Sequence, residues 1–207
     1  MTSPLRQEQA QLTRHRIMDA AYALLLEVGY ARTTITAVAE RAGVAVPTIY
    51  KGFGSKAQLA KKVYDRTLAG DDADAPLGDR PQAKELLAER DPQQVIKRYA
   101  TLVTELSTRL GPLLAVLLAA QSTEPQLQEF VTTIERERRA GNERFAAHLD
   151  DIGGLTVDDR RACDVLWLFT APEVHQRLVR QRGWTADEFR DWLAETLTTQ
   201  FLGNVSH

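Results

Sequence analysis

The sequence predicts an all-α protein, and three observations indicate this fold class. Apolar residues recur at intervals close to 3.6 residues, the period of a helix that buries one face. Glycine and proline stand at the ends of these periodic segments or at a few breaks between them. At 207 residues, 43% of them hydrophobic, the chain can bury the core of one large domain or of two small ones.

The first expected helix spans residues 14–28 and is amphipathic. Gly29 follows its last apolar residue, as is usual where a helix ends. The apolar face consists of Ile17, Ala20, Ala21, Leu24, Leu25 and Val28. We expect this helix to pack across the next two helices and to close a three-helix core.

Residues 33–56 predict two short helices joined by a tight turn. Thr34 stands at the first N-cap, where its hydroxyl can accept a hydrogen bond from a backbone amide. Gly43 ends this helix, because a residue without Cβ enters a left-handed turn without a clash. The second helix has Pro47 in its first turn and buries Ile49 and Phe53. The buried face of the first helix, at i, i+3, i+4 and i+7, consists of Ile35, Val38, Ala39 and Ala42.

The outward side chains of the second helix are suited to DNA. Val46, Thr48, Tyr50 and Lys51 offer apolar surface, a hydroxyl, a phenol and an ammonium. Such groups touch thymine methyls, read base edges and bind phosphates from the major groove. The pair of helices therefore predicts a helix-turn-helix.

A fourth helix is expected from Ser55 to about Leu68, because Ser55 and Gln58 form a capping-box pattern. Lys56 falls in its first turn, where the helix dipole disfavours a cation. A phosphate lying against the amides and the ammonium would explain the lysine. The predicted DNA-binding residues are Thr34, Thr36, Val46, Pro47, Thr48, Tyr50, Lys51 and Lys56.

Residues 33–56 resemble the N-terminal helix-turn-helix of the TetR family of transcriptional repressors, whose pattern is T-T-x-x-x-[IV]-A-x-x-A-G-V-S-x-[GP]-T-[LIV]-Y-x-[HY]-F-x-[SN]-K. The matching residues are Thr33, Thr34, Val38, Ala39, Ala42, Gly43, Val44, Pro47, Thr48, Ile49, Tyr50, Phe53, Ser55 and Lys56. Ala45 replaces a frequent serine, so the second helix lacks a side-chain cap. Gly52 replaces a frequent histidine or tyrosine, so a phosphate contact or some packing is missing. The resemblance covers little more than a tenth of the chain.

Charge divides the chain into a basic head and an acidic body. Residues 1–64 hold nine Lys/Arg and four Asp/Glu, whereas the whole chain has a formal net charge of −2. A basic N-terminal part fits a polyanionic partner, although charge varies along any chain.

The remaining helices follow an acidic, Pro/Gly-containing segment at 70–82, which is interpreted as a linker or loop. A turn of helix is expected at 83–89, a helix from Asp91-Pro92 to Leu110, and a buried segment at 112–120 after a break at Gly111-Pro112. A long helix is expected at about 125–151. Two more are expected at 156–182 and 185–202, the first interrupted near Thr170–Glu173 by a capping-box pattern with Pro172 inside.

The C-terminal part also resembles a TetR-type domain, through Leu166-Trp167, Pro172-Glu173-Val174, Arg182-Gly183-Trp184 and Trp192-Leu193. The resemblance implies a homodimer paired through its last two helices and a small-molecule pocket among the preceding ones. The expected domains are residues 1–60, which bind DNA, and residues 61–207, which bind the effector and dimerise. The expected dimer face is Phe189, Trp192, Leu193, Leu197 and Phe201.

Two polar residues interrupt the apolar stripe of the helix at 125–151. Arg138 is either a ligand for an anionic effector or an arginine paired with Glu135 or Glu137. His148 is either a hydrogen-bonded core histidine or a ligand group. The candidate effector residues are Tyr99, Leu102, Leu117, Phe130, Ile134, Arg138, Phe145, His148 and Trp167.

Several classes of protein are disfavoured by the sequence. The His residues and the single Cys163 are scattered, so neither a metal site nor a cofactor is expected. Cys163 is interpreted as a core or interface residue rather than a nucleophile. The longest strongly apolar stretch, residues 112–120, is far shorter than the ~20 residues that span a bilayer, so we expect a soluble cytoplasmic protein.

Three functions remain open. The first is a homodimeric repressor released from a palindromic operator by a small apolar or aromatic effector. The second is an activator or an architectural DNA-binding protein without a small ligand. The third is a helical enzyme, for which no acid, base or nucleophile set is visible.

Overall fold

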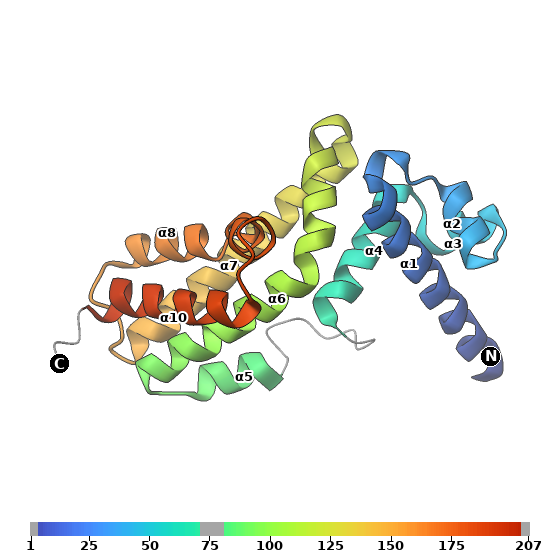
Figure 1. Cartoon of the computed structure of the whole chain (residues 1–207). Coiled ribbons are helices and arrows are strands. Elements are labelled where there is room, and N and C mark those ends of the chain that lie inside the picture. The colour runs from blue at the N-terminus through green and yellow to red at the C-terminus, as the bar shows by residue number, and fades with distance from the viewer. Residues whose placement is uncertain (1–3, 71–80, 204–207) are drawn as a thin grey trace. The chain divides into compact units, whose positions relative to one another are not determined.

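The computed structural model describes residues 4–70 and 81–203, and every regular element in those ranges is a helix (Figure 1). The all-α prediction is confirmed. In chain order the elements are α1 (Pro4–Arg32), α2 (Ile35–Ala42), α3 (Val46–Phe53), α4 (Lys56–Ala69), α5 (Pro81–Ala88), α6 (Pro92–Ala120), the 3-10 helix η2 (Gln121–Thr123), α7 (Pro125–Asp151), α8 (Asp159–Phe169), α9 (Pro172–His175), the π-helical η3 (Gln176–Gln181) and α10 (Ala186–Leu202).

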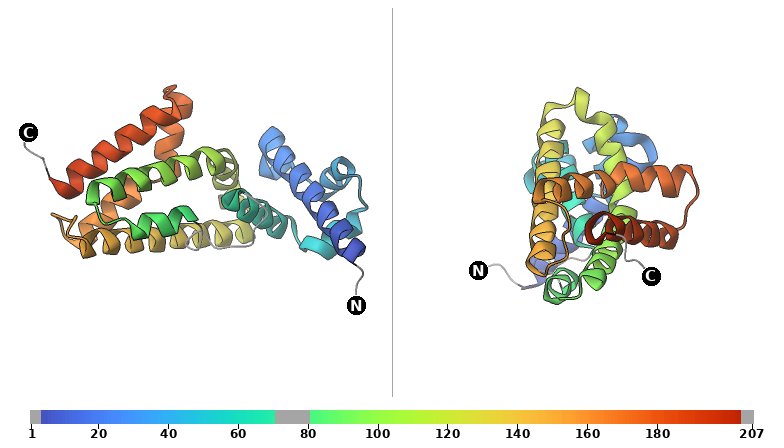
Figure 2. Two further views of the ribbon diagram at one scale, coloured as in Figure 1. Left: turned by 90° about the horizontal axis from the view of Figure 1, so that it is seen from below. Right: turned by 90° about the vertical axis from the view of Figure 1, so that its left-hand side faces the viewer.

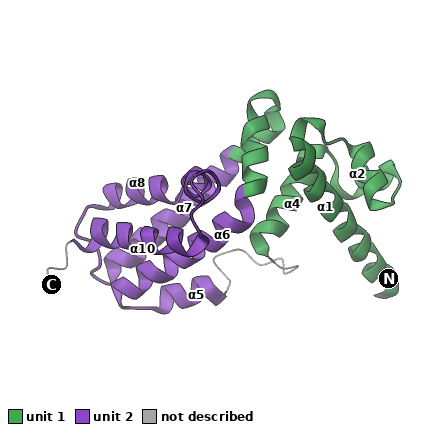
Figure 3. Cartoon of the chain, in the orientation of Figure 1, with its two compact units in different colours: residues 1–72, 112–131 green, residues 73–111, 132–207 purple. Residues whose placement is uncertain are grey.

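The chain divides into two compact units, shown in different colours in Figure 3. Unit 1 comprises residues 1–72 and 112–131, and unit 2 comprises residues 73–111 and 132–207. Each of the helices α6 and α7 therefore has one end in unit 1 and the other end in unit 2. This division differs from the expected boundary at residues 60 and 61, because α4 lies entirely in unit 1 and the turn between α6 and α7 joins it there. Most of the predicted linker, residues 71–80, lies outside the described residues.

α1 is longer than the predicted 14–28 and begins at Pro4. Its first turns carry no apolar stripe and their side chains from Leu5 to Leu12 are exposed, so hydrophobic periodicity gave no signal for them. At the other end the predicted stop is confirmed, since Gly29 has φ 80° and ψ 167°, outside the helical region. Thr33 then donates from both its amide and its hydroxyl to the Gly29 carbonyl.

The core of unit 1 is formed by the apolar faces read from the sequence. Its buried side chains include Ile17, Ala21 and Leu25 of α1, Val38 and Ala39 of α2, Ile49 and Phe53 of α3, and Leu59 and Val63 of α4. Burying these side chains is what holds three helices of only 8 to 14 residues, because isolated helices of that length are marginal in water.

The predicted break at Gly111-Pro112 is wrong, because α6 continues through Pro112 to Ala120. Pro112 has no N–H to donate to the carbonyl four residues earlier. The leucines that follow it, Leu113, Leu114 and Leu117, are buried, and this packing supports the helix across the proline. The segment Pro92–Thr123 is consequently long and apolar enough to span a membrane, by length and composition only. Its buried apolar residues are those of a packed core helix.

The core of unit 2 combines α6, α7, α8 and α10. In the left view of Figure 2 the α6 ribbon lies between α10 and α7. Tyr99 of α6 stacks on Phe145 of α7, with ring centroids 3.7 Å apart. The fully buried members of this core include Val95, Ile96, Leu149, Leu166, Phe189, Leu193, Leu197 and Phe201.

The expected helix at 156–182 is three elements in the structure. α8 ends at Phe169, and α9 restarts at Pro172 with Ala171 as its N-cap. The predicted capping box at Thr170 does not form, because the Thr170 hydroxyl donates back to the Leu166 carbonyl at 2.6 Å. The last helix does have a capping box, made by Thr185 and Glu188. Two hydrogen bonds from Thr185 hold the pKa of the Glu188 carboxyl below its usual value.

Candidate nucleic-acid interface

α2 has the caps that its sequence predicts. The Thr34 hydroxyl accepts a hydrogen bond from the Ala37 amide at 3.1 Å. Gly43 has φ 64° and ψ 42°, the left-handed conformation that glycine adopts without strain. The Val44 amide then donates to the Ala39 carbonyl at 3.0 Å, which completes the turn into the next helix.

α3 begins at Val46 without a side-chain cap, since its N-cap residue is Ala45. Pro47 lies in the first turn and needs no hydrogen bond there. Ile49 and Phe53 are buried, and together they hold one edge of the helix against the unit 1 core. The short helix is thus positioned by packing rather than by its caps.

The opposite side of α3 faces solvent. Thr48, Tyr50 and Lys51 are exposed, and the Tyr50 side chain is among the most exposed large side chains, at 54%. Pro47 is also exposed and Val46 is half-buried. At the start of α2, the predicted contacts Thr34, its N-cap residue, and Thr36 are exposed as well. The structure therefore leaves these seven side chains accessible over α2 and α3, as a DNA-reading surface requires.

Lys56 has an intramolecular partner that the sequence did not reveal. Its ammonium donates to the Tyr30 carbonyl at 3.1 Å and lies 4.1 Å from the centroid of the Tyr30 ring. Burial, together with the Glu124 carboxylate, raises the pKa of Tyr30 to about 12, so the ring is a neutral phenol at physiological pH. The contact therefore joins a cation to a π-face and a carbonyl. The contact connects the start of α4 to the end of α1. It accounts for a lysine in the first turn of α4 without a bound phosphate.

The predicted capping box of α4 is confirmed. The Ser55 hydroxyl accepts from the Gln58 amide, and the Gln58 side chain accepts from the Ser55 amide. The Ser55 hydroxyl also donates to Gln126 of α7 at 3.1 Å. Further along α4, the Tyr64 ring meets Phe130 of α7 edge to face, with centroids 5.4 Å apart. These contacts lie within unit 1 and join the helix after the recognition segment to the start of α7.

Arg14 of α1 contacts the end of α3, a role that the sequence analysis missed. One guanidinium nitrogen donates to the Gly52 carbonyl at 3.4 Å, and the group lies 4.7 Å from the centroid of the Phe53 ring. A Cβ at Gly52 would meet nothing within 4 Å, so this side of α3 is open. Arg14 contacts a backbone carbonyl 38 residues away and the ring of the residue after it, so the sequence pattern held no signal for this contact.

The basic residues of unit 1 differ in their ion pairing. Arg41 pairs with Glu27, Arg66 with Asp19, and Lys61 with Asp65. By contrast, Arg6, Arg16 and Lys51 form no ion pair among residues 4–70 and 81–203. These three side chains keep a positive charge without a paired carboxylate, which favours a polyanionic partner.

The candidate effector residues are divided between the two units. Leu117 and Phe130 belong to unit 1, where both are buried. In unit 2 Ile134 is buried, Leu102 is half-buried and packs on the core, and His148 shares a hydrogen bond with the Glu89 carbonyl at 3.2 Å. Trp167 is 51% exposed. Within unit 2 the structure brings Tyr99 and Phe145 into direct contact, as it does Arg138 and Trp167.

Buried polar groups that the sequence did not single out lie beside Tyr99. The Tyr99 hydroxyl donates to Asn142 at 2.7 Å, and the Asn142 amide lies 3.4 Å from the Thr170 hydroxyl. Burial raises the pKa of Tyr99, which keeps it a neutral donor. Asn142 lies between Arg138 and Phe145 on the apolar stripe of α7. A polar residue at this position was the signal in the sequence for a buried polar group.

Arg138 adopts the ion-paired arrangement. Its guanidinium donates to Glu135 at 2.8 Å and to the Trp167 carbonyl at 2.9 Å, and it lies 5.4 Å from the centroid of the Trp167 ring. The side chain is only 16% exposed. Its Nε is buried and has no hydrogen-bond partner among the described residues. One N–H of this side chain is thus available to an acceptor.

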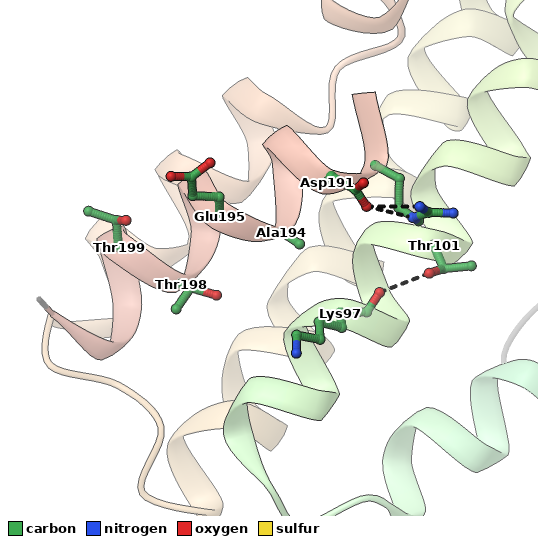
Figure 4. Close-up of a pocket in the computed structure, with 8 residues that line it drawn as sticks. Lys97, Thr101, Asp191, Ala194, Glu195, Thr198 and Thr199 are labelled. Carbon is green, nitrogen blue, oxygen red and sulfur yellow. Dashed lines mark hydrogen bonds and ion pairs between the residues drawn. The ribbon is translucent and has the colours of Figure 1, made fainter. Parts of the chain in front are cut away.

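A groove of about 420 Å³ lies on the surface of unit 2 between α6 and α10 (Figure 4). Lys97 and Thr101 come from α6 and the other lining residues from α10. None of the nine candidate effector residues lines it. The lining residues are Lys97, Thr101, Arg190, Asp191, Ala194, Glu195, Thr198 and Thr199.

The predicted dimer face requires a correction. Phe189, Leu193, Leu197 and Phe201 are fully buried in the core of their own unit. Trp192 is half-buried and contacts Phe169 and Trp184 of the same unit. The apolar stripe of α10 faces the core of its own unit, where α8 packs against it and His175 of α9 contacts Phe189. These four side chains are therefore unavailable to a second subunit.

Cys163 is half-buried beside the unit 2 core, and burial raises the pKa of its thiol. A thiol with a raised pKa is a poor nucleophile at neutral pH. Among the described residues, no three His, Cys, Asp or Glu side chains come together as metal ligands.

Residues 17–63 match the family of bacterial regulatory proteins of the tetR type. Among curated proteins, the HTH-type transcriptional regulator YdeS of Bacillus subtilis is 30% identical over 128 residues. This alignment covers 61% of the present chain and 59% of YdeS, so the chain spans about three fifths of that relative.

Solved structures share the fold over nearly the whole chain. NalD, the secondary repressor of the MexAB-OprM multidrug efflux pump in Pseudomonas aeruginosa, superposes with a TM-score of 0.67 at 20% identity, over 94% of this chain and 98% of that one. SmeT in complex with triclosan also superposes with a TM-score of 0.67, at 24% identity and over 90% of each chain. At these identities the likeness shows the fold alone.

Proposed function

We propose that this chain, which belongs to the TetR family of bacterial regulatory proteins, is a transcriptional repressor. It leaves a pseudo-palindromic operator when a small apolar or aromatic effector binds. The observation that carries the DNA-binding part is the outer face of α3. Thr48, Tyr50 and Lys51 are exposed there, while Ile49 and Phe53 anchor the helix from behind. A supported helix with polar and aromatic groups on its free face is suited to the major groove.

A homodimer follows from the size of this surface. α3 has only 8 residues, too few to bury the area of a specific protein–DNA interface. Two copies related by a two-fold axis would double the contacts and read inverted half-sites. The apolar stripe of α10 is occupied within its own unit, so pairing uses other surfaces.

The effector part of the proposal is supported by the surroundings of Tyr99 and Arg138. Apolar and aromatic side chains from α6, α7 and α8 meet there, with a few polar groups among them, as in small-molecule sites. The buried Arg138 Nε offers a donor to an acceptor on the ligand. The aromatic ligand named in the SmeT complex is consistent with this class of effector.

Selection of random duplex DNA by the full-length protein, followed by sequencing, tests the proposal. We expect inverted half-sites separated by about one helical turn, ~34–36 Å, or a little more. Enriched sites without inverted symmetry would contradict a dimer, and no enrichment would contradict specific DNA binding.

Transcription in vitro from a promoter that carries the selected site tests the direction of regulation. A repressor lowers the transcript level, and the effector restores it. An increase caused by the protein alone would identify an activator. We propose a cytoplasmic protein without enzymatic turnover, in keeping with relatives named as transcriptional regulators.

A further inference from the structure

The first turns of α1 bury none of their side chains in their own chain. Every side chain from Leu5 to Leu12 is exposed, and packing begins only beyond this segment. Figure 1 shows these turns of α1 extending past α2 and α3. An exposed helical segment of this kind gains nothing from core burial in its own chain.

Arg14 connects this segment to the proposed DNA-reading helix. Its guanidinium donates to the Gly52 carbonyl at 3.4 Å and lies over the Phe53 ring at 4.7 Å, both at the end of α3. The contact places one side of α1 directly beside that end. A Cβ at Gly52 would meet nothing within 4 Å, so the side of α3 at this residue is open as well.

Arg6, Ala10 and Arg14 form a single ridge on α1. Residues four apart lie on the same face of a helix, so Arg6 is placed two turns beyond Arg14, ~12 Å along the axis. Arg6 forms no ion pair among the described residues. Residues two apart in a helix point to opposite sides. Leu12, two residues from both Ala10 and Arg14, therefore lies on the side of α1 away from the ridge, and so does Glu8, two residues from Arg6.

We propose that the Arg6–Ala10–Arg14 ridge binds the phosphate backbone of DNA next to the segment that α3 reads. This inference rests on the proposed function and adds a second contact element to it. Charge and position identify DNA phosphate as the partner of this ridge. The guanidinium groups of Arg14 and Arg6 lie on one face of α1, Arg14 contacts the end of α3, and guanidinium groups bind phosphate well. The contact is to the backbone, so it strengthens binding to all sequences equally.

Two variants that each add one positive charge test which side of α1 faces the DNA. Ala10→Lys places a cation on the ridge, and Leu12→Lys places the same cation on the far side, both at exposed positions of the same segment. Affinity for the selected operator and for random duplex is measured over a series of salt concentrations. Each new phosphate contact steepens the slope of log K against log salt by about 0.9. We expect that steepening for Ala10→Lys and a clearly smaller effect for Leu12→Lys.

Removing a charge tests the native contact. Arg6→Gln should make the slope of log K against log salt shallower by about 0.9, both on the selected operator and on random duplex. Between 50 and 200 mM salt the variant should therefore lose affinity by about threefold less than the wild type. Arg160→Gln on α8 of unit 2 is the matched control, since it removes the same charge at an exposed position. Equal slopes for Arg6→Gln and the wild type, or equal effects of the two added lysines, would overturn the proposal. A wild-type protein that binds neither DNA would instead refute the proposed function itself.

Discussion

At the scale of the residue, several side chains have roles that local chemistry determines and others have roles that depend on a distant partner. Thr34, Gly43 and Ser55 act on the backbone within three or four residues, and the structure confirms each of them. Lys56 and Arg14 act across the unit, on Tyr30 and Gly52 respectively. The predictions for single residues follow this distinction.

Thr48 and Tyr50 should read bases rather than hold the backbone. Their side chains are exposed on the free face of α3 and make no contact that the fold requires. Thr48→Ala or Tyr50→Ala should cost on the order of 1–3 kcal/mol on the selected operator and less on random duplex. Binding titrations on both DNAs measure the difference, and equal losses at Thr48 would show a contact to the backbone only.

Lys56→Met should weaken the connection between α4 and α1. The substitution removes the hydrogen bond to the Tyr30 carbonyl and the cation–π contact, so we expect a loss of about 1–2 kcal/mol in the free energy of unfolding. DNA binding should fall on specific and random duplex alike. Lys62→Met, whose side chain is exposed and pairs with Asp65 only at 3.7 Å, is the control and should change stability little. Unchanged stability of Lys56→Met with weaker DNA binding would instead identify Lys56 as a phosphate ligand.

His175 should make stability depend on pH. It is buried, shares a hydrogen bond with Thr108 at 3.2 Å, and packs edge to face on Phe189. Burial, and then the Arg180 charge, lowers its pKa in the folded protein. The unfolded chain therefore binds the proton more readily, so this contribution to stability is complete above about pH 6.5 and is lost as the pH falls towards the lower folded pKa.

Chemical denaturation at pH 7.5 and pH 5 checks this expectation. The wild type should lose more stability between the two pH values than His175→Gln, which keeps a polar side chain beside Thr108 and does not titrate. An identical pH dependence in both proteins would exclude His175 as the cause.

At the scale of the element, α10 illustrates how an amphipathic helix is misassigned. Its apolar stripe was read as an interface because a terminal helix needs something to cover it. In the structure the core of its own unit covers it, with Phe189, Leu193, Leu197 and Phe201 fully buried. An amphipathic pattern shows that a face is buried and does not show whether its own chain or another buries it.

A charge on this stripe should therefore unfold unit 2. Phe201→Asp creates an unpaired carboxylate in the core and should cost more than about 3 kcal/mol of stability. Thr199→Asp, on the exposed side of the same helix, is the matched control and should leave stability almost unchanged. Circular dichroism during denaturation and light scattering measure the two effects. A folded, monomeric Phe201→Asp protein would contradict the burial seen here and restore the stripe as an interface.

At the scale of the whole molecule, the proposed regulation requires that effector binding and operator binding influence each other. The covalent route is provided by α6 and α7, each of which belongs to both units. Within unit 1, α4 contacts the start of α7 through Ser55–Gln126 and Tyr64–Phe130. A displacement of α7 would thus be transmitted to α4, the helix that follows the DNA-reading segment.

Arg138→Met tests this coupling from the effector side. We expect a coupling free energy of about 1–3 kcal/mol in the wild type, a 5- to 150-fold change in operator affinity, and the same factor for the effect of operator on effector binding. The variant lacks the buried Nε donor, so the effector response should disappear while operator affinity without effector stays unchanged. Isothermal titration with and without operator measures both directions. An unchanged response would leave Arg138 as the partner of Glu135 and Trp167 only.

The sequence by itself determined the features that depend on neighbours along the chain. Hydrophobic period, caps and turn glycines predicted α2, α3, α4 and α7 closely, because each depends on residues within one or two turns. The exposed groups of α3 followed from the same reasoning, since a short helix with one buried edge must expose the rest. Pro112 was the local signal that misled, because burial of the leucines after it outweighs one missing hydrogen bond.

Only the tertiary structure decided which surfaces meet. Lys56, Arg14 and Arg138 each have one partner that lies 26, 38 and 29 residues away in the chain, respectively, and over such distances the sequence pattern has no period to reveal contact. The covering of α10 and the exposure of the first turns of α1 were decided in the same way, by which helices pack together. Hydrophobic burial is non-directional, so a sequence states that a face will be buried, and only the packed chain establishes what buries it.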